Sequence, residues 1–306
     1  MSFPSYDAPS SEEIARQAGL AVGQIVRFDG NTSPQALPSS RAEVLLEELA
    51  RIHTYPHGGY PSLEEVLARY AGVAPENVVL GAGADDLILL VTRSFAGRGD
   101  RVAIANDPTY PLFEIAVHVA GAEVGDREPA LTICCRPNNP TGELGPVPEA
   151  RPLVVDEAYF EYCGETAVDL IEDGVVVIRT FSKVFGLAGA RVGYALAGRD
   201  VAAELKRRQH PAPLSTLSAA LAIAALESPP DVRPILEERE RFAGRLREQG
   251  YDPWPSEANF LYVPVEEPRE LYDRLLAQGL AVRPVRGGIR ITIRSEADDE
   301  RLLQAL

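Results

Sequence analysis

Short, wholly apolar runs alternate with amphipathic segments along most of the first 200 residues of this chain. The runs have the length of strands, and the segments between them show the helical spacing of apolar positions. Continuous apolar strands that alternate with helices indicate a parallel sheet covered on both faces. The expected strands are Val78–Leu80, Val102–Ala105, Leu131–Cys135, Leu153–Val155, Val175–Ile178 and Val192–Leu196, with helices over about 84–96 and 109–120 between them.

Before the first of these strands the pattern predicts three helices. Ser10 with Glu13 three positions later is typical of a capped helix start. A polar connector over residues 30–34 separates this helix from a second one over about 40–52. The third is expected over 62–71, beginning at Ser62, with Glu65 three positions further on.

The pattern changes near residue 200. Helices are expected over 199–209, 215–227 and 231–249, and the strands 260–263 and 289–293 flank a helix over 267–279. The last strand alternates apolar and polar residues, which predicts an antiparallel sheet with one exposed face. The fold class is therefore α/β: a mostly parallel central sheet flanked by helices, with a smaller α+β C-terminal domain. We expect a large domain over 35–206 and a small domain made of 1–34 and 207–306.

Composition narrows the possible partners. The net charge of −15 argues against nucleic acid or an anionic membrane as the main partner. No apolar stretch approaches the roughly 20 residues of a membrane span, and the first residues lack the pattern of a signal peptide. The three cysteines are too few for a disulfide framework. These features predict a soluble cytoplasmic protein, and no metal is expected.

Lys183 is one of two lysines beside 28 arginines. It follows the apolar run Val175–Ile178 and stands next to Ser182, with Arg191 eight positions later. Burial lowers the pKa of a lysine, which makes it the usual residue for imine chemistry. The other lysine, Lys206, lies in a charged helical segment that is typical of a solvated surface. Lys183 is thus the candidate nucleophilic amine.

Other polar groups follow the remaining strands, where sheets of this kind bind ligands. The turn Gly81–Gly83 opens a helix at Ala84 and Asp85, and free N–H groups at a helix start bind phosphate. Tyr110 follows the next strand and Asn139 the one after it. Asp156 ends a wholly apolar strand, so its carboxylate requires a cationic partner, either a ligand or a structural salt bridge.

Together these groups match the needs of pyridoxal 5′-phosphate (PLP). Its aldehyde needs an amine, its ring nitrogen an anion, and its phosphate N–H groups and a cation. Taken singly, each motif has an ordinary structural explanation, such as a tight turn, a packed tyrosine or an ion pair. What favours the cofactor is the whole set in chain order: a phosphate-binding helix start, an aromatic ring, an amide, a buried carboxylate, a lysine and an arginine.

The motifs Asn138–Gly142, Asp156–Tyr159 and Ser182–Lys183 with Arg191 resemble those of the fold-type I PLP aminotransferases. Among these, the chain most resembles the histidinol-phosphate aminotransferases, from Tyr6 to the last helix. The resemblance implies that Lys183 forms the imine with the cofactor and that Asp156 pairs with its ring nitrogen. It also implies these contacts: Tyr110 stacked on the ring, Asn139 and Tyr159 at the 3′-oxygen, and Ala84, Asp85, Thr180, Ser182 and Arg191 at the phosphate.

The resemblance further implies a shared site in a homodimer, because Tyr55-Pro56 looks like the motif that reaches the cofactor phosphate of the neighbouring subunit. It implies a substrate site at Tyr6, Asn31, Asn259, Arg283 and Arg290. The expected reaction is transamination of histidinol phosphate, a phosphorylated amino alcohol, with 2-oxoglutarate in histidine biosynthesis.

Two segments depart from the family pattern. Only Gly125–Ala130 separates Ala122–Val124 from the next strand, and residues 143–152 are short and proline-rich. The large domain is therefore expected to lack covering helices and an edge strand on one flank, which affects the sheet edge or dimer surface. The connector at residues 29–34 also departs from the usual acidic form of the family.

Alternative functions stay open at this point. Threonine-phosphate decarboxylases and aromatic aminotransferases resemble the same family and use the same cofactor. A PLP-binding transcriptional regulator is disfavoured by the charge and by the lack of an added DNA-binding segment. A catalytically silent domain would not need the lysine, the carboxylate and the arginine together.

Overall fold

A seven-stranded sheet forms the larger part of the molecule. The computed structural model describes residues 9–34, 45–56 and 59–306. The sheet has the order β2-β8-β7-β6-β5-β3-β4, and β8 runs antiparallel to both of its neighbours while the other pairs are parallel. The strands are β2 (Val78–Gly81), β3 (Arg101–Ile104), β4 (Glu123–Val124), β5 (Leu131–Cys135), β6 (Leu153–Asp156), β7 (Val175–Thr180) and β8 (Gly193–Leu196).

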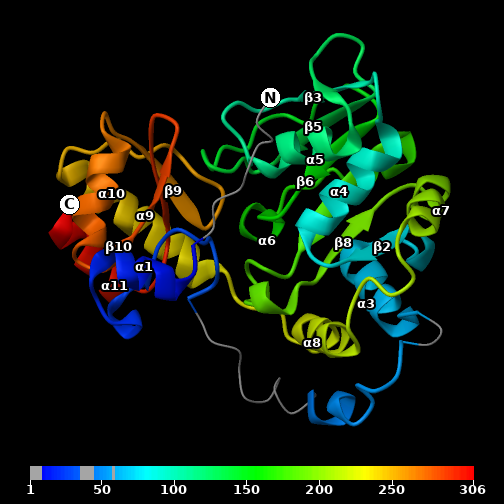
Figure 1. Ribbon diagram of the computed structural model, residues 1–306, viewed down its shortest axis with the longest axis horizontal. Coiled ribbons are helices and arrows are strands. Elements are labelled where there is room, and N and C mark those ends of the chain that lie inside the picture. The colour runs from blue at the N-terminus through cyan, green and yellow to red at the C-terminus, as the bar shows by residue number, and fades with distance from the viewer. Residues whose placement is uncertain (1–8, 35–44, 57–58) are drawn as a thin grey trace.

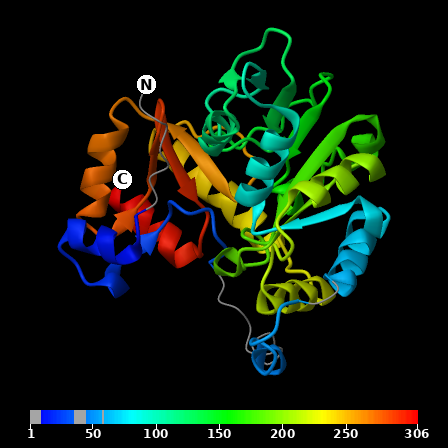
Figure 2. The ribbon, with the colours of Figure 1, turned by 45° about the vertical axis from the view of Figure 1, so that its right-hand side comes forward.

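Helices cover both faces of this sheet (Figures 1 and 2). Successive side chains of a strand point to opposite faces, so Val154 and Val155 of β6 enter two different core clusters. The cluster with Val154 includes α4 (Ala84–Phe95), α5 (Leu112–Ala120) and α7 (Arg199–Arg208). The cluster with Val155 includes α3 (Pro61–Ala71), α6 (Phe160–Cys163) and α8 (Thr216–Glu227). Burial on both faces explains why these strands are wholly apolar.

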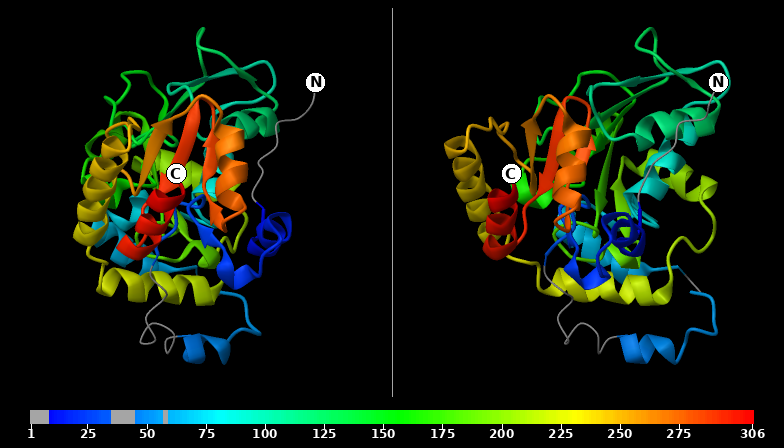
Figure 3. Two further views of the ribbon diagram at one scale, coloured as in Figure 1. Left: turned by 90° about the vertical axis from the view of Figure 1, so that its left-hand side faces the viewer. Right: turned by 60° about the vertical axis from the view of Figure 1, so that its left-hand side comes forward.

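A smaller antiparallel sheet, β11-β12-β9, carries the C-terminal part of the chain. Figure 3 shows its strands in orange and red with α9, α10 and α11 beside them. The N-terminal segment joins this part, because β1 pairs with β10 and because Ile14 and Phe28 lie in its core cluster. The elements are α1 (Ser11–Ala18), β1 (Val26–Arg27), α9 (Arg233–Glu248), β9 (Phe260–Pro264), α10 (Pro268–Leu276), β10 (Leu280–Ala281), β11 (Arg283–Val285), β12 (Gly288–Thr292) and α11 (Glu296–Ala305).

The expected α/β class with a mostly parallel sheet is confirmed. Ser10 caps α1 as expected, since its hydroxyl accepts a hydrogen bond from the Glu13 amide. The start of α3 was predicted wrongly: the helix begins at Pro61, without a side-chain cap, because proline is well suited to a first helical turn. Part of the helix expected over 40–52 lies outside the described residues, and residues 45–49 are helical.

The last strand also differs from expectation. All five residues of β12 are buried, including Arg290 and Thr292. The alternation therefore does not separate a core face from a solvated one. It separates a core face, with Ile289 and Ile291, from a face turned toward the large sheet. Polar residues on that second face can form a site instead of a surface.

The division into two domains stays a prediction, and the structure suggests one refinement of it. The apolar residues of α8 pack in the cluster of the large sheet, against α3, although 216–227 fall on the small-domain side of the expected boundary. We propose that the small domain resumes after α8. None of the helices in the described ranges is both long and apolar enough to cross a bilayer.

Candidate active site

The carboxyl ends of the large-sheet strands open onto a cavity of about 220 Å³. Residues from the large sheet line it together with Arg290 of the small sheet and the connector residues Gly30–Thr32. The cavity brings together most of the residues predicted from sequence: Asn31, Ala84, Asp85, Tyr110, Asn139, Asp156, Tyr159, Thr180, Ser182, Lys183, Arg191 and Arg290.

Lys183 reaches the cavity from the turn that follows β7. The hydroxyl of Thr180, at the end of β7, accepts a hydrogen bond from the Ser182 amide (3.1 Å) and donates to the Ser182 hydroxyl (3.0 Å). Burial lowers the pKa of Lys183 to about 8, and the charge of Arg290 contributes to this shift. A larger fraction of this amine is neutral at physiological pH than for an ordinary lysine. This lysine is therefore suited to act as a nucleophile and a base.

Asp156 is the buried carboxyl group of the site, with 3% of its surface exposed. Burial raises its pKa to about 7, although the Ala158 amide donates a hydrogen bond to its Oδ1 (3.1 Å). Within the described residues Asp156 forms no ion pair, so the salt bridge considered as its structural explanation is not observed. The ion pair at this strand end belongs instead to its neighbour Glu157, which faces Arg179. Asp156 therefore lines the cavity without an ion pair to any side chain in the described part of the chain, although the charge of Lys183 acts on it and favours its ionised form.

The start of α4 has the form of an anion site. Gly83 precedes the helix with a φ of +91°, and no side chain caps the first turn. Arg191 lies close by, since a Cβ built on Gly83 would meet its Nη2 at 2.8 Å. A Cβ on Gly193 of β8 would meet the backbone of Gly83 at 2.7 Å. The two glycines thus let the helix start, the strand and the guanidinium come together.

Asp85 provides a carboxylate within this anion site. Its Oδ2 lies 3.0 Å from Nη2 of Arg191, and its Oδ1 accepts a hydrogen bond from the Tyr110 hydroxyl (3.1 Å). The prediction concerned only the backbone of Asp85. Its side chain places Arg191 and the ring of Tyr110 on opposite sides of one carboxylate, and both side chains line the cavity. Tyr110 lies in the loop before α5, which begins at Leu112 and not near residue 109 as expected.

Arg290 joins the two sheets at the cavity. Its Nη1 donates a hydrogen bond to Oδ1 of Asn139 (2.6 Å), and its Nη2 donates to the carbonyl of Asp29. Arg283 is directly opposite Arg290 in the β11–β12 register, so both side chains point to the same face of the small sheet. Arg290 lines the cavity, whereas Arg283 is not part of the cavity wall.

Asn31 links the connector to both sheets. Its Nδ2 donates to the Tyr159 hydroxyl (2.9 Å), and its Oδ1 accepts from the Thr292 hydroxyl (2.9 Å). Asn259 lies behind Asn31, where its Nδ2 donates to the Asn31 carbonyl (3.2 Å). Asn259 thus supports the site from outside the cavity.

A further ion pair joins the two sheets. Arg286, on the β11–β12 turn, lies 2.8 Å from Asp107 on the loop that follows β3.

Three of the described residues that were predicted for the site do not line this cavity. Asn259 and Arg283 are two of them, and the third, Tyr55, lies in a separate groove between residues 48–56, residues 59–63 and α8. Tyr6 lies outside the described residues. Sequence reasoning did not single out Gly30, Thr32, Cys135, Ala158 and Ala188, which also line the cavity. Cys135 ends β5, so its position at a strand end was the available signal. The others contribute mainly small side chains, which carry little chemical signature.

Comparison with known proteins agrees with this geometry. The family model described as "Aminotransferase class I and II" matches residues 15–128 and 125–306. The chain therefore belongs to the class I and II aminotransferase family. The relatives that it resembles are named histidinol-phosphate aminotransferases. That of Thermoanaerobacter pseudethanolicus is 34% identical over 316 aligned residues, which cover 89% of this chain and 90% of the relative.

Solved structures show the same fold. The crystal structure of histidinol-phosphate aminotransferase from Sinorhizobium meliloti, in complex with pyridoxal-5′-phosphate, has a TM-score of 0.87 and 27% identity, covering 98% of this chain and 94% of that one. L-threonine-O-3-phosphate decarboxylase from Porphyromonas gingivalis has a TM-score of 0.80 at 20% identity, covering 92% and 97%. The predicted resemblance is confirmed, while the fold alone is shared with a decarboxylase.

The Thermoanaerobacter relative is longer than this chain within the aligned region. The 316 aligned residues with the Thermoanaerobacter relative outnumber the 306 of this chain, yet include only 89% of it. The relative therefore has additional residues within the aligned region. The family model matches the chain in two segments that overlap at residues 125–128, inside the segment Gly125–Ala130. Directly before this segment β4, two residues long and exposed, forms the edge of the large sheet.

Proposed function

We propose that this protein binds pyridoxal 5′-phosphate in the cavity and transfers the amino group of histidinol phosphate to 2-oxoglutarate. The observation that carries the proposal is that one cavity is lined both by a lysine of lowered pKa and by a buried carboxyl group that forms no ion pair with any described side chain. The relatives named histidinol-phosphate aminotransferase support this choice of substrate.

The residues present fit this cofactor. A protonated ring nitrogen would supply the positive partner that Asp156 lacks, which would favour the ionised carboxylate. The uncapped start of α4, the hydroxyls of Thr180 and Ser182 and the guanidinium of Arg191 would hold the phosphate. Tyr110 would lie against the ring, with Asn139 and Tyr159 at its 3′-oxygen.

Each residue then has a defined task in the reaction. When bound, PLP supplies an electron sink for the negative charge that develops at the α-carbon of the amino donor. Lys183 would hold the cofactor through Nζ and, once displaced by the donor, remove the proton from that α-carbon. Asp156 would keep a proton on the ring nitrogen. Arg290 and Arg283 would bind the phosphate of the donor, or a carboxylate of 2-oxoglutarate, with a planar guanidinium.

Substrate trials with the purified protein and PLP test the proposal. Histidinol phosphate, threonine phosphate and phenylalanine are supplied separately, each with and without 2-oxoglutarate. We expect glutamate to form fastest from histidinol phosphate and only when 2-oxoglutarate is present. Release of carbon dioxide from threonine phosphate without an acceptor would identify a decarboxylase, and preferred use of phenylalanine would identify an aromatic aminotransferase.

Arg290→Lys tests the anion site within the same assay. A lysine keeps the charge and loses the paired geometry of the guanidinium. Hydrogen bonds to charged groups contribute about 1.5–3 kcal/mol, so KM for histidinol phosphate should rise by roughly tenfold to a hundredfold. The control is Arg294→Lys, just beyond the same strand, where the side chain pairs with Asp298 instead. An unchanged KM in Arg290→Lys would exclude Arg290 from substrate binding.

We further propose that the protein is a homodimer with shared sites. Leu46, Leu49 and Ile52 are exposed apolar residues in the segment 45–56, and Tyr55 is 79% exposed. Figures 1 and 3 show this blue segment below α3 and α8, at the edge of the molecule. An apolar group in this position is typical of an interaction surface. A second copy would cover it and bring Tyr55 to the neighbouring cavity.

Mixed dimers provide the test of shared sites. Tyr55→Ala and Lys183→Ala are each expected to be weakly active or inactive. Dissociated and reassociated together, they form hybrids in which one cavity has both the native lysine and the native tyrosine, so activity should reappear. Leu49→Glu should shift sedimentation toward the monomer, whereas Val22→Glu, at an exposed apolar residue elsewhere, should not. Failure of the mixture to regain activity would contradict a shared site.

A further inference from the structure

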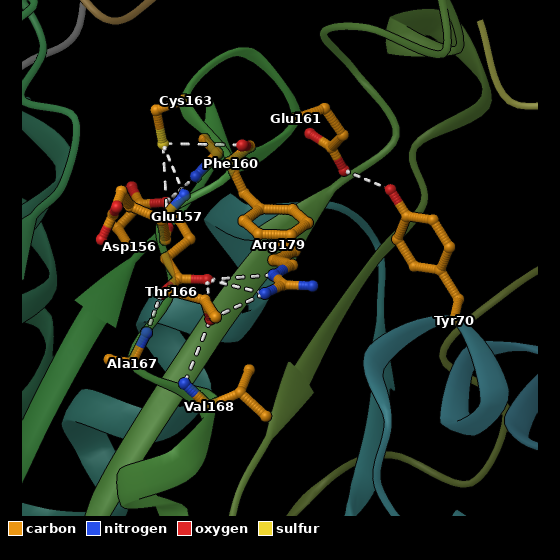
Figure 4. A network of polar contacts seen from close by, with 12 residues as sticks. Tyr70, Asp156, Glu157, Phe160, Glu161, Cys163, Thr166, Ala167, Val168 and Arg179 are labelled. Atoms are coloured by element: carbon orange, nitrogen blue, oxygen red, sulfur yellow. Dashed lines mark hydrogen bonds and ion pairs between the residues drawn. The ribbon is translucent and has the colours of Figure 1, made fainter.

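A buried ion pair lies directly behind the cavity, at the ends of β6 and β7. Nη2 of Arg179 is 3.0 Å from Oε2 of Glu157, and the two side chains are 2% and 0% exposed. Figure 4 shows the pair among residues that follow β6. Arg179 and Glu157 do not line the cavity. The substrate and cofactor roles described above therefore leave this pair unused.

The polar groups around the pair are well matched. Glu157 accepts hydrogen bonds from the Ala167 amide (2.6 Å), the Thr166 hydroxyl (2.9 Å) and Nε of Arg179 (3.0 Å). Arg179 also reaches the Thr166 oxygen through Nη2 (2.8 Å), and its guanidinium lies 3.5 Å from the centre of the Phe160 ring. Such satisfied buried networks hold their members in one geometry.

The pair is connected to the cavity through the alternation of side chains along the strands. Asp156 and Thr180 point into the cavity, while Glu157 and Arg179, their chain neighbours, point to the opposite face. The Glu157 amide continues the ladder by donating to the Ile178 carbonyl (2.8 Å). The guanidinium of Arg179 thus contacts both Glu157 and Phe160. These two residues flank Ala158 and Tyr159 in the sequence, and Ala158 and Tyr159 belong to the cavity wall. It also belongs to the strand that leads to Lys183.

Stability alone is a weak explanation for such a pair. The cost of removing two charges from water is often as large as their attraction, and apolar replacements of similar volume can be equally stable. The observed contacts instead constrain two turns relative to each other. On the basis of the proposed PLP function, we propose that Glu157 and Arg179 are positioning residues that hold the Asp156–Tyr159 turn against the Thr180–Lys183 turn. The pair thereby fixes the position of Lys183 relative to Asp156 and limits its access to water.

Other charged groups act on the two sites and guide the choice of variants. Lys183 is affected by Arg290, Asp85, Asp156 and Arg191. Around Arg179, the further titratable groups are Glu161 of α6, Tyr194 of β8 and Tyr70 of α3, whose hydroxyl lies 3.4 Å from Glu161. Variants of Glu157 and Arg179 leave the four groups that act on Lys183 in place, but the charge of Glu157 also acts on Asp156. A variant that keeps both charges, such as Thr166→Val, therefore reports a change of geometry alone.

The test uses the cofactor-free protein and its two lysines. An amine-reactive acylating reagent is applied over a range of pH, and mass spectrometry measures labelling at Lys183 and at Lys206, which pairs with Glu64 on the surface. Lys206 is the internal control for reagent and pH. The variants are Glu157→Met with Arg179→Met, which removes both charges, and the milder Thr166→Val. Leu302→Ala creates a cavity in the core of the small sheet and is the control for a general loss of stability.

The labelling midpoint is the pH at which labelling is half of its maximum. We expect the midpoint of Lys183 to move to higher pH, toward that of Lys206, in the double variant and to a smaller extent in Thr166→Val. PLP binding should weaken about tenfold or more, the loss that supporting contacts typically cause when removed from a binding site. Leu302→Ala should lower Tm without moving the midpoint. If the double variant does not fold, Thr166→Val decides the question.

Unchanged midpoints and PLP affinity in a folded variant would overturn the positioning role. This outcome is distinct from failure of the proposed function, in which the unmodified protein itself would not bind PLP.

Discussion

Replacing Lys183 with alanine is expected to reduce aminotransferase activity by at least about 10³-fold, since a positioned acid–base group alone contributes roughly 10²–10⁴-fold. The same substitution removes the group that would hold the cofactor, so the visible absorbance of the bound cofactor should change as well. Activity and absorption spectra of purified Lys183→Ala measure the two effects. Lys206→Ala is the matched control, because it removes the other lysine from a surface ion pair.

Near-normal turnover by Lys183→Ala would disprove the assignment of the catalytic amine. Loss of activity in both lysine variants would instead indicate a general defect of folding. Circular dichroism of each variant separates the second outcome from the first. The lysine content makes this comparison complete, since Lys183 and Lys206 are the two lysines of the chain.

Replacing Asp156 with asparagine should reduce kcat by about 10²- to 10³-fold, the usual effect of removing one fixed electrostatic group from an active site. Asparagine has nearly the same shape but cannot be an anion, so it cannot keep a proton on the cofactor ring nitrogen. Asp156→Glu restores the charge with a longer side chain and should recover part of the rate. Steady-state kinetics of both variants provide the measurement, and equal rates in Asp156→Asn and the unmodified protein would refute the role.

The same variant has a consequence for stability without the cofactor. Burial raises the pKa of Asp156 from 3.8 to about 7, so the folded state binds this proton more tightly than the unfolded state does. Its contribution to the free energy of unfolding is therefore present below about pH 4 and is lost as pH rises to about 7, by at most about 4 kcal/mol. Urea unfolding of cofactor-free protein should show this loss relative to Asp156→Asn. Saturating PLP should reduce it by supplying the missing cation.

The sequence predicted the large sheet well because its strands are buried on both faces. Runs such as Val175–Ile178 contain no alternating polar residues, so they cannot be taken for strands with one exposed face. The residues that follow these strands meet at one edge of the sheet because the strands are parallel. Asp156, Lys183 and Arg191 were therefore placed together correctly from chain order. The short pairs β1–β10 and β11–β12 have two or three residues on one strand, which is too little for a periodic pattern.

Side-chain partners were harder to predict than positions. The apolar strand before Asp156 indicated a buried charge with a protein partner as one possibility, but the ion pair formed at the next residue, Glu157. Nothing in the local pattern distinguishes the two faces at a strand end. Likewise, Asn139 was expected to face the cofactor, and its Oδ1 accepts a hydrogen bond from Arg290, a residue 151 positions away. Contacts of such separation depend on how the two sheets meet.

The ion pair between Arg286 and Asp107 has a consequence for the release of product. Both side chains are largely in water, 66% and 78% exposed, and pairs of this kind contribute at most about 1 kcal/mol. That is close to the thermal energy of about 0.6 kcal/mol, so the bond breaks and re-forms freely. The contact can align the two sheets between turnovers without delaying the departure of product. Added salt would weaken it further.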